Sequence, residues 1–140
     1  NLAFEQQGGG QVKLKEILAA KPLTLLVFVQ PGKEPTKHLI ESIRQSGNQF
    51  NKWNGSIAFC LKDIQALSQL KADLNNDFPS NYQLFMDPGM RTMEKVKSDI
   101  KIEGRLELPL VILVNPNGQV LLISTGYKIG ISEQILKIEA

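Results

Sequence analysis

Hydrophobic residues along the chain fall into short runs separated by polar and glycine-rich segments. The run from Leu23 to Val29 is almost entirely apolar and contains β-branched and aromatic residues. Such a run is typical of a strand that is buried on both faces of a sheet. Ser56 to Leu61, Tyr82 to Met86 and Leu110 to Val114 are of similar character. The pattern therefore predicts a sheet whose central strands lie between two covering layers.

Between these strands, the apolar residues are spaced for helices. A first helix is predicted from Pro35, because proline is favoured in the first helical turn, with an end or kink near Gly47. A second is predicted after Asp63, whose carboxylate suits an N-cap and which is followed by apolar residues three and four positions apart. Met90 to Ile100 predicts a charged amphipathic helix, and Ser132 is expected to cap a last helix.

Glycine and asparagine mark two hairpins. Asn1 to Gln7 and Gln11 to Leu18 are two short segments around three glycines, and Asn115 to Gly118 precedes a returning strand, Gln119 to Thr125. Strands and helices alternate between the hairpins. This order implies a single α/β domain over residues 1–140, with a central mixed β-sheet flanked by helices on both faces and an N-terminal β-hairpin.

Composition narrows the function classes. The 140 residues are 42% hydrophobic and 21% charged, which is typical of a globular chain. A net charge of +2 is too small to indicate nucleic-acid binding, and no apolar run approaches the roughly 18 residues of a membrane helix. One cysteine and one histidine exclude an internal disulfide, a CxxC pair, a zinc–cysteine cluster and a histidine-rich metal site. We expect no metal and no cofactor.

Four stretches, in this order along the chain, resemble the thioredoxin superfamily, and more closely its TlpA-like and redoxin branch. They are Gly10–Leu18, Val27–Lys37 (VFVQPGKEPTK), Phe85–Gly89 and Leu108–Gly118 (LPLVILVNPNG). The resemblance implies a thioredoxin-like fold. It also implies a cis peptide bond between Leu108 and Pro109 at the start of the second hairpin.

The redox motif of that family is degenerate in this chain. Its four positions read Lys33, Glu34, Pro35 and Thr36, so both cysteines are absent. Thiol–disulfide exchange needs an attacking thiolate and a resolving thiol. A lysine ammonium cannot attack, and the hydroxyl of Thr36 would need an activating base, of which the sequence gives no sign. A peroxiredoxin-like shift of the register, to Gln30 or Lys33, also finds no cysteine. We therefore expect no catalytic residue at this site.

Three other residues have chemistry to consider. Cys60 lies in a predicted strand, where a free cysteine usually packs as a small hydrophobe, although a reactive thiol is the alternative. His38 is expected to be solvated or hydrogen-bonded near the start of its helix. Trp53 is expected to cover the far end of that helix, and an exposed indole there would indicate partner binding.

The sequence favours a redox-inactive accessory or interaction domain. In the family, the groove between the motif loop and the cis-proline loop holds extended peptide, so Lys33, Thr36, Leu108 and Pro109 are its expected lining. The expected partner is a peptide, another protein or another domain of the same chain. Because the first residue is Asn1 rather than Met, the domain is expected to be a fragment or C-terminal module of a longer protein. The alternative is an oxidoreductase of this superfamily that works without thiols or through Cys60. Family analogy predicts export, to the periplasm for example, and leaves the cytoplasm open.

Overall fold

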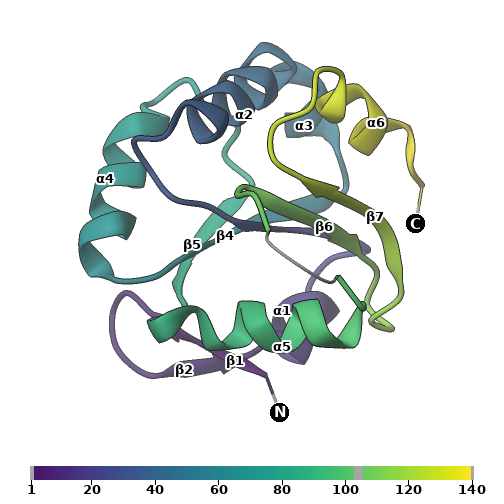
Figure 1. The fold of residues 1–140 in the computed structure, drawn as a ribbon. Helices are drawn as coiled ribbons and strands as arrows, with labels where there is room; N and C mark the ends of the chain where they lie inside the picture. The colour runs from purple at the N-terminus through teal and green to yellow at the C-terminus, as the bar shows by residue number, and fades with distance from the viewer. Residues whose placement is uncertain (1, 103–105, 140) are drawn as a thin grey trace.

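A computed structural model describes residues 2–102 and 106–139. Seven strands form one mixed sheet in the order β2-β1-β5-β4-β3-β6-β7 (Figure 1). β4 pairs in parallel with β3 and with β5, and the remaining pairs are antiparallel. The strands are β1 Ala3–Gln6, β2 Gln11–Lys13, β3 Leu23–Phe28, β4 Gly55–Leu61, β5 Tyr82–Met86, β6 Leu110–Val114 and β7 Val120–Thr125.

Helices cover both faces of this sheet. Figure 1 shows α1 and α5 below it and α2, α3, α4 and α6 above it. The helices are α1 Leu14–Ala19, α2 Glu34–Gln45, α3 Gly47–Lys52, α4 Ile64–Leu74, α5 Arg91–Asp99 and α6 Ile131–Lys137, with a 3-10 turn at Pro88–Met90 before α5. The mixed sheet, the two helical layers and the N-terminal hairpin are confirmed.

The two helical layers bury two separate cores, because successive side chains of a strand point to opposite faces. On β3, Leu25 and Val27 face the α2–α4–α6 layer, whereas Leu26 and Phe28 face α1 and α5. All six residues of β3 are buried. This two-sided burial explains why its sequence is a continuous apolar run rather than an alternating one.

Two local predictions were wrong. The segment from Gln11 to Leu18 was expected to be one arm of the hairpin, but only β2 is extended, and α1 follows at once. The backbone N–H of Lys13 donates to the Glu16 carboxylate at 2.9 Å, which holds the first turn of α1.

Ser132 was expected to cap α6, but the N-cap is Gly130, which has φ +86°. Ser132 is fully buried, and its hydroxyl lies 2.7 Å from the Ser42 hydroxyl on α2. It therefore ties two helices together. In contrast, Asp63 caps α4 as predicted, accepting from the Ala66 N–H at 2.8 Å.

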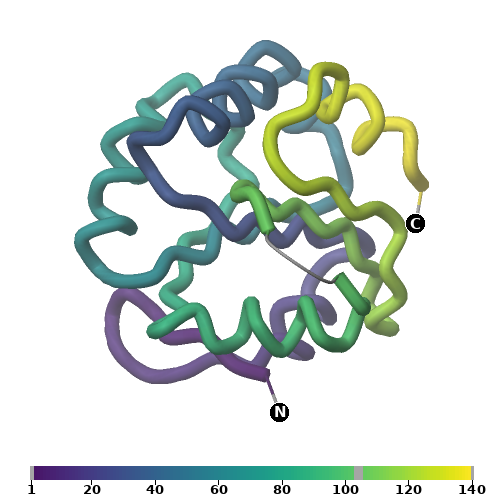
Figure 2. The backbone as a smooth tube through the Cα atoms, viewed as in Figure 1, coloured from purple at the N-terminus to yellow at the C-terminus, as the bar shows by residue number. Residues whose placement is uncertain are grey.

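The chain trace places the N-terminal hairpin beside α5 (Figure 2). A hydrogen bond from the Thr92 hydroxyl on α5 to the Ala3 carbonyl joins them at 2.6 Å. β3 and β5 are both parallel to β4, so their carboxyl ends lie at the same end of the sheet. α2 and α5, which follow these strands, therefore begin at that end and then run over opposite faces.

Candidate functional site

The degenerate motif lies at the start of α2. Lys33 is the N-cap residue, with an extended backbone (φ −92°, ψ 146°), and its side chain makes no capping hydrogen bond. Glu34 and Pro35 form the first turn, as the preference of proline for this position predicts. Lys33 is exposed, so its ammonium remains hydrated at the positive end of the helix.

Thr36 occupies the last motif position and is only 1% exposed. Its hydroxyl donates to the Gln30 carbonyl at 2.9 Å, across the loop that joins β3 to α2. Because the hydroxyl proton is held by this carbonyl and no base contacts it among the described residues, Thr36 fixes the loop rather than offering a nucleophile.

The second loop of the site precedes β6. The Leu108–Pro109 peptide bond is cis, and Pro109 is buried. The Gly126 N–H, at the end of β7, donates to the carbonyls of both Glu107 and Pro109 at 3.0 Å. Gly126 has φ +68°, a left-handed backbone conformation that residues with a Cβ rarely adopt, so the turn favours glycine at this position.

These two loops enclose a groove of about 550 Å³. The structure brings Lys33, Pro35, Thr36 and Leu108 together in its walls, whereas Glu34 points away toward His38 and Pro109 is not part of the lining. Sequence reasoning missed the remaining three lining residues, which are Gln30, Leu106 and Glu107. Their residue types gave no signal, but each lies within three positions of a predicted groove residue.

Cys60 is a core residue and does not line the groove. It is fully buried on β4, in the core beneath α1 and α5, with its Sγ 3.6 Å from the Ala58 carbonyl. Burial, reinforced by the charge of Asp87, raises the pKa of the Cys60 thiol well above its ordinary value. The thiolate that an enzymatic role would require is therefore disfavoured, and the predicted core role of Cys60 fits its position.

His38 and Trp53 each contact neighbouring side chains. His38 is largely solvated and lies 3.5 Å from the Glu34 carboxylate, and its ring is tilted against that of Tyr127 with centroids 5.4 Å apart. Trp53 is half-buried and meets Phe50 edge-on at 5.5 Å, so it covers the end of the α2–α3 segment as predicted. Residues 2–102 and 106–139 contain no group of three potential metal ligands and no helix long and apolar enough to span a membrane.

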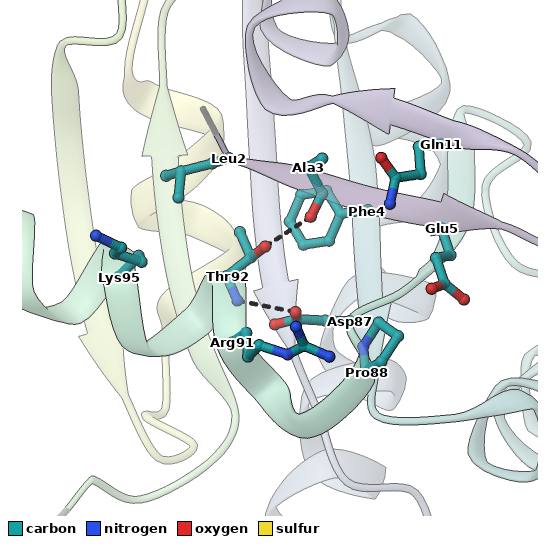
Figure 3. A pocket seen from close by; sticks show the side chains of 10 residues that line it. All are labelled: Leu2, Ala3, Phe4, Glu5, Gln11, Asp87, Pro88, Arg91, Thr92 and Lys95. Carbon is teal, nitrogen blue, oxygen red and sulfur yellow. Dashed lines mark hydrogen bonds between the residues drawn. The ribbon is translucent and has the colours of Figure 1, made fainter.

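A second hollow, of about 350 Å³, lies between the hairpin and α5 (Figure 3). Its buried acid, Asp87, accepts from the backbone N–H groups of Thr92 and Met93, both at 2.9 Å. Thr92 in turn binds the Ala3 carbonyl, as Figure 3 shows. Asp87 and Thr92 therefore hold the start of α5 and join it to the hairpin.

The sheet order, the cis-proline loop and the position of α2 define a thioredoxin-like fold, and comparison with solved structures confirms it. No protein-family model and no curated protein matches the chain. A thioredoxin-like protein from Bacteroides caccae superposes with a TM-score of 0.65 at 22% identity, over 96% of this chain and 46% of that one. This chain therefore spans less than half of that protein.

Two redox proteins are similar in fold. The thioredoxin domain of a thiol-disulfide oxidoreductase from Bacteroides vulgatus superposes with a TM-score of 0.61 at 17% identity, over 97% of this chain and 93% of that one. The bacterioferritin comigratory protein of Xanthomonas campestris, studied for alkyl peroxide reduction, gives a TM-score of 0.67 at 15% identity, over 96% and 87%. At these identities the likeness shows the fold, and the activity of this chain must be argued from its own residues.

Proposed function

We propose that this domain is a redox-inactive thioredoxin-like module that binds an extended segment of a protein partner, or of another domain of its own chain. The groove between the α2 loop and the cis-proline loop is the binding site. The observation that carries the proposal is the combination in one groove of an intact cis-proline loop with Lys33 and Thr36 at the motif positions.

The groove offers the contacts that an extended peptide needs. Among the described residues, no hydrogen bond reaches the backbone N–H or carbonyl of Leu108, so both groups are free to pair with an added strand. Leu106 and Leu108 are half-buried and supply apolar surface. Exposed Lys33 and Glu107 carry opposite charges, which favours one direction of the peptide over the other.

The absence of redox activity rests on the side chains present. Electron transfer by this fold requires a thiolate in the groove, and the single cysteine of the chain is buried in another part of the sheet. Because the chain resembles TlpA-like domains, we propose that the module is exported and works in the periplasm or another compartment outside the cytoplasm.

Binding is tested with an array of random-sequence decapeptides, followed by titration of the selected peptides into the isotopically labelled protein. We expect the amide signals of Lys33 and Leu108 to shift. Leu108→Arg, which fills the groove, should weaken binding by about tenfold or more, or about 1.4 kcal/mol. The matched control Ile64→Arg changes an exposed apolar residue on α4 and should bind as the wild type does. Binding that is absent, or unaffected by Leu108→Arg, would contradict the proposal.

Redox inactivity and the motif register are tested together. In a Cys60→Ala background, Lys33→Cys combined with Thr36→Cys should form a reducible disulfide, because the two positions start a helix in the manner of a CxxC pair. The unaltered chain should remain at background in insulin-reduction and peroxide-consumption assays. Catalysis by the wild type would refute inactivity, and two thiols that do not pair in the folded variant would refute the register.

A further inference from the structure

The chain contains two Asn-Gly pairs, and the fold places them in different surroundings. Asn54–Gly55 lies at the start of β4, and Asn117–Gly118 lies in the turn between β6 and β7. Asparagine is a thermolabile residue, and its carboxamide is open to attack by the next backbone nitrogen when glycine follows, because glycine has no Cβ to obstruct the approach. Sequence alone does not distinguish the two pairs, so a large difference in reactivity must come from the fold.

The first pair is held inside the packed structure. Gly55 is buried on the central strand β4, in register with Leu23 of β3. The indole ring of Trp53 covers it, with carbon atoms 2.7–2.8 Å from the position that a Cβ would take. The Gly55 carbonyl also accepts from the Asn81 carboxamide at 3.1 Å. The Gly55 nitrogen can reach the Asn54 carboxamide only if the start of β4 leaves this packing, and a central strand opens only with much of the fold.

The second pair is held by one turn. Asn117 and Gly118 are exposed, and open space surrounds the position that a Cβ would take on Gly118. Within residues 2–102 and 106–139, no group forms a hydrogen bond with the Asn117 carboxamide, whereas the Asn115 carboxamide accepts from the N–H groups of Asn117 and Gln119. The Gly118 N–H donates to the Asn115 carbonyl at 3.0 Å. Opening this turn frees the Gly118 nitrogen without disturbing either core.

We propose that Asn117 is a deamidation site of the folded protein and that Asn54 is protected. The Gly118 nitrogen forms a bond to the Cγ of Asn117, and its proton leaves with the side-chain nitrogen as ammonia. The product is a five-membered succinimide. Water then adds to one of its two carbonyl carbons and opens the ring. Opening at Cγ gives aspartate at position 117, and opening at the backbone carbonyl gives isoaspartate. No oxidant or reductant takes part.

The products alter the hairpin and leave the groove intact. Each event replaces a neutral carboxamide by a carboxylate, so the formal net charge falls by one from +2. Isoaspartate also adds a backbone carbon between the N–H groups of Asn117 and Gly118, both of which bond to Asn115. The tip of the hairpin should therefore loosen. This tip follows the carboxyl end of β6, whereas the groove lies at the amino end of that strand.

Incubation at mildly alkaline pH, followed by digestion and mass spectrometry of the peptides that contain each pair, tests the proposal. In the folded chain, position 117 should convert at least about tenfold faster than position 54, whereas in urea the two rates should agree within about threefold. Chromatography of the peptide that contains position 117 should separate aspartate from isoaspartate. Equal rates in the folded chain, or conversion of position 54 alone, would overturn the proposal. A preference for position 117 that persists unchanged in urea would also overturn it, because the fold would then not be its cause.

Asn115→Ala tests the opening of the turn. This variant removes the acceptor of the Asn117 and Gln119 N–H groups, so the turn should open more often. Conversion at position 117 should then become faster by about threefold or more, with no change at position 54. Asn51→Ala, which changes an exposed asparagine on α3, is the matched control and should leave the rate at position 117 as in the wild type. An unchanged rate at position 117 in Asn115→Ala would contradict the proposed opening.

Discussion

The starts of α2 and α5 lie at the same edge of the sheet and are built in opposite ways. α5 begins under Asp87, a carboxylate that is 1% exposed and binds two backbone N–H groups of the first turn. α2 begins at Lys33, an exposed cation whose side chain offers no acceptor to the first turn. A helix N-terminus is ordinarily stabilised by an acceptor such as the first and disfavoured by a cation such as the second.

The two helix starts therefore have different surroundings: the start of α5 is bonded to the N-terminal hairpin, and the start of α2 borders the groove. At α5 the capped turn is also bonded to the N-terminal hairpin, because the Thr92 hydroxyl donates to the Ala3 carbonyl. At α2 the Thr36 hydroxyl donates to the Gln30 carbonyl, while Lys33 borders the groove. We therefore expect stability to depend more on the start of α5, whereas the start of α2 borders the groove in which we propose that a ligand binds.

The largest effect is expected from removing the buried cap. Asp87→Ala leaves two backbone N–H groups without their acceptors and should lower the free energy of unfolding by about 2–3 kcal/mol. Urea denaturation measures this. Asp63→Ala, which removes a single capping bond on α4, should cost about 1 kcal/mol, and Lys33→Ala should stay within about 0.5 kcal/mol of the wild type. Equal losses in Asp87→Ala and Lys33→Ala would remove the contrast.

The next largest effect is a pH dependence of the free energy of unfolding, which originates at Cys60, near Asp87. Cys60 lies on β4 between β3 and β5, and burial with the nearby charge of Asp87 raises its pKa. The unfolded thiol ionises near pH 8.5, at about its reference pKa. Below that pH both states keep the proton, and above it only the native state does. The native state should therefore lose up to about 1.4 kcal/mol of stability per pH unit, until the native pKa is reached.

Unfolding free energies of the wild type and of Cys60→Ala, measured from neutral to alkaline pH, isolate this contribution. The lysines and tyrosines titrate in both proteins, so the difference between the two profiles belongs to the thiol. The wild-type curve should fall more steeply above the unfolded pKa. Two parallel curves would show that Cys60 ionises as readily in the fold as in the unfolded chain.

The contrast between these regions also marks what could be predicted from sequence. Tyr82–Met86 and Leu110–Val114 were located residue for residue, because burial on the sheet imposes a local apolar pattern. α1 was missed because six residues are too few to display a helical period beside a hairpin. Ser132 and Glu107 owe their places to contacts with Ser42 and with Gly126, which are distant in sequence, so no local signal could assign them.

The smallest expected effect is also the most specific to the open helix start. Lys33→Asp supplies an acceptor at the N-cap of α2 and replaces a cation by an anion at the positive end of the helix. Both changes favour the native state, so the free energy of unfolding should rise by about 0.5–1 kcal/mol. Lys37→Asp, which changes an exposed lysine within the same helix, has no N-cap role and serves as the matched control.

If the groove binds extended peptides, the stabilised Lys33→Asp variant should also bind them differently, because it reverses the charge at one end of the groove. A gain in stability with unchanged peptide binding would indicate that Lys33 is tolerated at the helix start without being used by the ligand.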